Sequence, residues 1–82
     1  MERIVSVKAG PNWTLEVEFS DGTRGIVSLR DDLVGPVFEP LKAPDYFAKV
    51  FLDEFGVPTW PNGADVAPDA IYDELRQKSQ VA

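Results

Sequence analysis

Residues 60–75 constrain the fold of this chain more than any other stretch, because they combine a tight-turn signal with a helix start. Gly63 follows Asn62, and both residue types tolerate the positive φ that tight turns often require. Pro68 suits the first position of a helix, where its missing N–H costs nothing. The sequence therefore predicts a strand that ends at Trp60, a tight turn, and a helix that begins at Pro68.

The predicted helix runs from Pro68 to Arg76 or Lys78. Ile71 and Leu75 lie four positions apart in it, so they share one helix face. We expect this apolar face to pack on a sheet.

Two stretches near the N-terminus predict strands. Residues 13–19 alternate between apolar and polar side chains, which is typical of a strand with one buried face. The apolar side chains of this strand are Trp13, Leu15, Val17 and Phe19. Residues 3–8 predict a shorter strand with Val5 and Val7 on one face.

The Asp21-Gly22 pair predicts a turn into a third strand, and its register follows from keeping one face apolar. A two-residue loop would place Leu15 opposite Ser28. A three-residue loop with Gly22 in the left-handed conformation places Leu15 opposite Val27 instead. We therefore predict a bulged hairpin.

The remaining chain predicts a Pro-rich loop at residues 36–44, a short helix at 45–49, and a second hairpin formed by 50–52 and 57–60. The expected fold class is α+β. It combines a small, mostly antiparallel sheet, built from a three-stranded meander plus the second hairpin, with the C-terminal helix and the short central helix. We expect one domain spanning residues 1–82.

Composition excludes several functions. The 82 residues include 14 acids and 8 basic residues, a net charge of −6, with no run of Lys or Arg, so direct nucleic-acid binding is not expected. The absence of Cys and His removes thiol chemistry and the commonest general base. No apolar run is long enough for a membrane span and no signal peptide is evident, so we expect a cytoplasmic protein without a cofactor.

Several motifs are shared with a known family. They are Phe19-Ser20-Asp21-Gly22, Phe38-Glu39-Pro40-Leu41, Phe47, Trp60-Pro61-Asn62-Gly63-Ala64-Asp65-Val66 and Pro68-x-x-Ile71-Tyr72. On these residues the chain resembles domain of unknown function 2442, a family of small bacterial α+β domains. The resemblance implies a fold and no activity. Some longer members carry a helix-turn-helix, which we do not expect in these 82 residues, and others lie beside small genes, which implies one half of a paired small-gene system.

Acidic side chains gather in the last third of the chain, and residues 59–75 contain four acids and no Lys or Arg. We therefore predict a protein-binding surface for a small, basic partner protein. Its candidate residues are Trp60, Asn62, Gly63, Asp65, Asp69, Tyr72 and Asp73. Trp60 or Tyr72 would supply the buried contact, since aromatic residues favour interface anchors. The competing interpretation assigns the aromatic residues to packing and the acids to solubility.

The alternative function is a weakly metal-dependent enzyme that uses the acidic cluster at residues 65–74. Asp69 and Asp73 lie four positions apart, so both carboxylates could face one Mg²⁺ or Ca²⁺ ion. The sequence lacks the spacing of a cation-binding loop and any nucleophile motif. We therefore assign no catalytic residue and no metal ligand.

Overall fold

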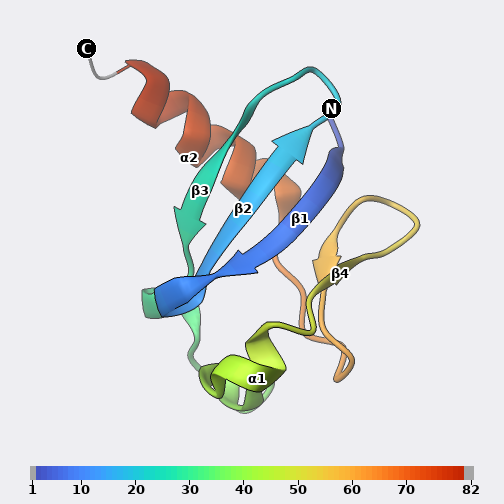
Figure 1. The fold of residues 1–82 in the computed structure, drawn as a ribbon, viewed down its shortest axis with the longest axis vertical. Helices are drawn as coiled ribbons and strands as arrows, with labels where there is room; N and C mark the ends of the chain where they lie inside the picture. The colour runs from blue at the N-terminus through green and yellow to red at the C-terminus, as the bar shows by residue number, and fades with distance from the viewer. Residues whose placement is uncertain (1, 81–82) are drawn as a thin grey trace.

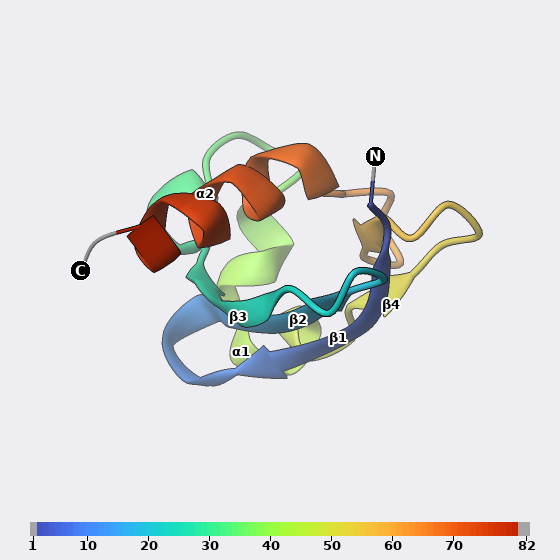
Figure 2. The same cartoon turned by 90° about the horizontal axis from the view of Figure 1, so that it is seen from above.

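The main sheet is an antiparallel meander in the order β1-β2-β3. Its strands are β1 (Ile4–Gly10), β2 (Thr14–Phe19) and β3 (Arg24–Ser28). The computed structural model describes residues 2–80, with side chains to residue 77. The C-terminal helix α2 (Pro68–Gln80) lies along one face of this sheet (Figures 1 and 2). The α+β fold class is confirmed, and α2 extends past the predicted end.

The register of the β2–β3 hairpin confirms the predicted bulged loop. Leu15 pairs with Val27, which places both side chains on the buried face. Gly22 has a φ of +90°, so it occupies the left-handed position that the three-residue loop requires. The Gly22 N–H donates to the Phe19 carbonyl at 3.0 Å, and the Phe19 N–H donates to the Thr23 carbonyl at 2.7 Å.

The face of β1 differs from the prediction, because a bulge interrupts the strand between Ile4 and Ser6. The bulge absorbs one residue and so changes which side chain faces the core. Ile4 is 1% exposed, whereas Val5 is 53% exposed. Val7 is partly buried against the core, so the predicted common face of Val5 and Val7 does not form one buried face.

Trp13 is not the first residue of β2. It ends the short turn η1 (Pro11–Trp13) with a φ of +59°, an unusual conformation for a large side chain. Its carbonyl accepts the Leu29 N–H at 2.9 Å. Its indole N–H donates to the Lys42 carbonyl at 3.2 Å. Trp13 therefore ties the meander to the loop that follows β3.

Short elements fill the middle of the chain: the predicted Pro-rich loop contains a 3-10 helix at 39–42, and the predicted short helix at 45–49 spans 44–47 instead. They are η2 (Arg30–Asp32), η3 (Glu39–Lys42), α1 (Pro44–Phe47), β4 (Phe51–Leu52) and β5 (Pro58–Thr59). Strands β4 and β5 form the second hairpin. A backbone bridge between Thr59 and Asp65 adds a further partner to β5.

The same loop geometry occurs three times within residues 2–80. The loops Phe19–Thr23, Asp53–Val57 and Trp60–Ala64 each have a glycine at the fourth position, with φ between +77° and +91°. In each loop the glycine N–H donates to the carbonyl of the first residue. The N–H of that first residue donates to the carbonyl of the fifth residue. This is a three-residue hairpin loop with a left-handed glycine.

The core lies between the sheet, α2 and the Pro-rich loop. Its buried apolar side chains are Ile4, Leu15, Val17, Phe19, Val27, Leu29, Leu33, Leu41, Phe47, Trp60, Ala64, Ile71 and Leu75. Gly25 brings α2 close to β3, because a Cβ there would lie 2.7 Å from Leu75 Cδ2. The helix face with Ile71 and Leu75 is thus confirmed as the packing face.

Candidate functional site

Trp60 belongs to the core and not to the surface. Its side chain is 1% exposed, and its ring centroid lies 5.5 Å from that of Phe47. The buried indole N–H donates to the Phe47 carbonyl at 2.9 Å, so its polar atom is satisfied internally. The predicted use of Trp60 as an interface anchor is therefore wrong, and packing explains this residue.

Asn62 and Gly63 build the turn that follows Trp60. The Asn62 Oδ1 atom accepts the Ala64 N–H at 3.1 Å, and its Nδ2 atom donates to the Val37 carbonyl at 2.8 Å. Gly63 has a φ of +91°, whereas Asn62 does not need a positive φ in this loop. Both residues are exposed, but their contacts serve the turn and the neighbouring loop.

Three predicted acids lie on the surface at the start of α2. Asp65, Asp69 and Asp73 are exposed, and we refer to them as the acidic face. Asp69 is in the first turn of α2, where the helix dipole favours a negative charge. Asp73 follows one turn later. Within residues 2–80, no group of three or more acids is arranged to hold a metal ion.

Tyr72 is half-buried between α2 and the β2–β3 loop. Its hydroxyl donates to Asp21 Oδ2 at 2.6 Å, and its ring meets Phe19 edge-on at 4.9 Å. The Tyr72 hydroxyl, followed by the Thr23 N–H, holds the pKa of the Asp21 carboxyl below its ordinary value of 3.8. The Arg76 guanidinium lies 5.8 Å from the Tyr72 ring centroid.

Asp21 and Arg76 are charged neighbours of Tyr72 that the sequence interpretation missed. Arg76 lies four positions after Tyr72 and so on an adjacent part of the helix surface, a spacing that the sequence does contain. It places a positive charge beside the acidic face. Asp21 was assigned to the turn alone, and nothing local connects it to a helix 51 positions away.

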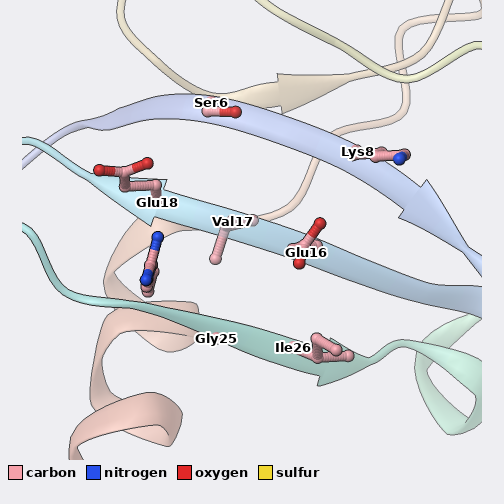
Figure 3. Close-up of a pocket in the computed structure, with 8 residues that line it drawn as sticks. Ser6, Lys8, Glu16, Val17, Glu18, Gly25 and Ile26 are labelled. Carbon is pink, nitrogen blue, oxygen red and sulfur yellow. The ribbon is translucent and has the colours of Figure 1, made fainter.

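The outer face of the main sheet is a second candidate surface. Side chains of all three strands line a shallow depression of about 710 Å³ there. Figure 3 shows these side chains along β1, β2 and β3. Lys8 pairs in register with Glu16, and Arg24 pairs with Glu18. The two basic and two acidic residues cancel in charge, so this depression does not favour either a basic or an acidic ligand. The acidic face is the stronger candidate for recognition.

The fold and the site define a small α+β domain. Its C-terminal helix presents exposed carboxylates beside Tyr72, which is fixed by Asp21 and Phe19. No helix within the described residues 2–80 has the length and apolar character needed to cross a bilayer. The chain belongs to the family described as protein of unknown function (DUF2442), whose model matches residues 4–77. The resemblance drawn from the sequence motifs is thus confirmed. Neither the curated proteins nor the solved structures give a match.

Proposed function

We propose that this protein is an interaction module that binds a small, basic protein through the acidic face and Tyr72. The observation that carries the proposal is the exposure of Asp65, Asp69 and Asp73 at one end of α2, within residues 59–75, which contain no Lys or Arg before Arg76. A concentrated negative field of this kind attracts a basic partner and orients it during encounter.

Because Trp60 is buried in the core, we assign the role of interface anchor to Tyr72. The Tyr72 ring is held on one side by Phe19, and its hydroxyl is held by Asp21. A side chain that is already ordered loses little conformational entropy when a partner covers it. Tyr72 therefore suits the role of anchor, with the acidic face beside it.

The biological setting of this interaction is part of the proposal. Some members of the family that this chain resembles lie beside other small genes, which implies a paired system. The partner would then be the product of such a neighbouring gene. The module would then regulate that partner by occupying its basic surface in the cytoplasm.

Charge reversal on α2 tests the proposed function. The double variant Asp69→Lys/Asp73→Lys should associate more slowly and bind more weakly to the protein that the parent captures, measured by surface plasmon resonance. Asp45→Lys/Glu54→Lys is the matched control, because it changes the net charge equally at exposed sites on α1 and the β4–β5 loop. Loss of the first turn's dipole interaction should cost ~0.5 kcal/mol, so thermal melting should change little.

Equal association rates for the two double variants would contradict the proposal, because net charge alone would then explain the effect. Unchanged binding by the α2 variant would contradict it more directly.

A further inference from the structure

Strand β1 is an outer strand of the meander, and it pairs with β2 on one side (Figure 2). The direction of the backbone groups along β2 is fixed by two hydrogen bonds at its end. The Phe19 N–H donates to the Thr23 carbonyl, toward β3, whereas the Ser20 N–H donates to the Arg3 carbonyl, toward β1. Because these directions alternate along a strand, the odd-numbered residues of β2 bond to β3 and the even-numbered ones bond to β1.

Four backbone groups on the other edge of β1 therefore have no partner. Val7 and Ala9 lie opposite Val17 and Leu15, which bond to β3, so the N–H and C=O groups of Val7 and Ala9 point away from the sheet. No hydrogen bond within residues 2–80 reaches these four groups. The β4–β5 loop covers this edge at Ile4, before the bulge. The edge from Val7 to Ala9 is thus open to a further strand.

An apolar hollow of about 210 Å³ lies at the end of this edge. Ala9 lines it from β1, and Phe47 and Ala48 line it from the end of α1. Asn12 and Trp13 also line it, and their positive φ values of +57° and +59° are the ones found in non-glycine residues within the described chain. Backbone strain of this kind clusters at binding sites. The volume is below the roughly 300 Å³ of small-molecule pockets, so the hollow fits one apolar side chain.

Strand β2 shows which side chains suit a strand beside β1. It places an apolar residue opposite Ala9, the acid Glu16 opposite Lys8, and a second apolar residue opposite Val7. Lys8 and Glu16 lie on the outer face of the sheet (Figure 3). Since β1 presents the same two faces to a strand on its open edge, a strand with the order apolar, acidic, apolar also matches that edge.

A second copy of the chain matches this edge poorly. The antiparallel register that bonds Val7 and Ala9 of both copies places Lys8 of one copy opposite Lys8 of the other. Like charges directly opposite each other destabilise a strand pair, and lysine on an edge strand commonly prevents self-pairing. The net charge of −6 on each copy adds to the repulsion.

We propose that the edge of β1 binds an extended peptide segment of a partner protein, which adds an antiparallel strand to the sheet. The segment bonds to the N–H and C=O groups of Val7 and Ala9, and its acidic residue lies beside Lys8. The apolar residue opposite Ala9 enters the hollow. This inference goes beyond the proposed function and does not depend on it, because α2 packs against β3 on the other side of the meander (Figure 1).

Hydrogen exchange with a short peptide tests the proposal. The probe is acetyl-Thr-Leu-Glu-Val-Thr-amide, which has the required order of side chains. When it binds, exchange of the Val7 and Ala9 amides should slow in NMR spectra, whereas the amides of Ser6 and Lys8, already bonded to β2, should keep their rates. No slowing at Val7 and Ala9, or slowing confined to other amides, would overturn the proposal.

A methylated peptide tests whether backbone bonds hold the strand. The same peptide with N-methyl groups on its Leu and Val lacks the two donors that face β1. It should bind at least about fivefold more weakly, the factor that a single hydrogen bond contributes. Equal binding of the two peptides would contradict strand addition.

An exchange of charges tests the role of Lys8. Lys8→Glu should weaken binding of the probe about two- to fivefold, and it should favour by a similar factor a probe with lysine in place of glutamate. Arg24→Glu is the matched control, since both variants place a glutamate opposite a glutamate of β2, at Glu16 and at Glu18. Arg24 lies on β3, so this variant should bind the probe as the parent does. Equal effects of the two variants would overturn the proposal.

Two further variants locate the hollow and separate the two proposals. Ala48→Leu should fill the hollow and weaken probe binding, whereas Ala43→Leu, at an exposed position outside its lining, should not. Equal effects of these two would refute the placement. Asp69→Lys/Asp73→Lys should bind the probe as the parent does, so loss of the basic partner leaves the peptide site standing. Concentration-dependent protection of Val7 without any probe would assign the edge to a second copy and overturn the proposal.

Discussion

Gly56 and Gly63 occupy the same position in two successive hairpin loops, with φ values of +77° and +91°. Replacing each by alanine should have different costs, because their surroundings differ. A Cβ at Gly63 would meet no atom of the described chain within 4 Å. A Cβ at Gly56 would lie 2.9 Å from the Ile4 carbonyl oxygen and 3.3 Å from Arg3 Cβ. The first of these contacts is with backbone, which cannot rotate away.

The cost of Gly63→Ala is conformational alone. An L-residue in the left-handed region loses roughly 1–2 kcal/mol, and alanine returns about 0.4–1 kcal/mol by restricting the unfolded chain. The net loss is about 1 kcal/mol. Gly56→Ala has the same cost plus displacement of β1 from the β4–β5 loop, which overpacking values put at about 1–3 kcal/mol. We therefore expect a total of about 2–4 kcal/mol for Gly56→Ala.

Urea denaturation monitored by tryptophan fluorescence measures the free energies of unfolding of Gly56→Ala and Gly63→Ala. Gly22→Ala is the second reference, because a Cβ there also meets nothing within 4 Å in the described residues. Asparagine separates the two causes, since it tolerates the left-handed region but still has a Cβ. Gly63→Asn should recover part of the loss seen with alanine, whereas Gly56→Asn should not. Equal losses for alanine at positions 56 and 63 would refute this reasoning.

Two further predictions concern aromatic residues. Trp60→Phe should reduce stability by about 2–4 kcal/mol, because it leaves a cavity and removes the 2.9 Å bond to the Phe47 carbonyl, which then keeps only the long 3.4 Å bond from the Val50 N–H. Trp13→Phe should cost less in the same denaturation assay, since Trp13 is only partly buried. Tyr72→Phe should lower stability near neutral pH, and the difference from the parent should shrink as pH falls below 3.8, because Asp21 has a lowered folded pKa and its contribution is lost on protonation. A pH-independent difference would show that the Tyr72–Asp21 bond does not contribute through the charge of Asp21.

Local patterns predicted those parts of the fold that a single turn or face determines. The register around Gly22 could be worked out because one face of β2 and β3 must remain apolar. The bulge at Val5 could not, since the pattern of alternation there fits either face. The left-handed conformation of Trp13 was also missed, because it depends on bonds to Leu29 and Lys42.

The charge of the candidate site could be predicted from the sequence, but the packing of its aromatic residues could not. The exposure of Asp69 and Asp73 follows from their positions opposite the helix face that contains Ile71. The burial of Trp60 depends on a helix that precedes it by 13 positions, and no local pattern connects the two.

Three side chains hold the irregular segment between β3 and β4, and all three donate to main-chain oxygens. Trp13 donates to the carbonyl of residue 42, Asn62 to that of residue 37, and Trp60 to that of residue 47. Every amino acid supplies such an oxygen, so these attachments do not depend on which side chains the segment carries. Replacing the exposed side chains at positions 37 and 42 should therefore leave these attachments in place, whereas replacing either indole or the amide that makes them should not. Evolution could thus change the surface of this segment, residue by residue, without moving it.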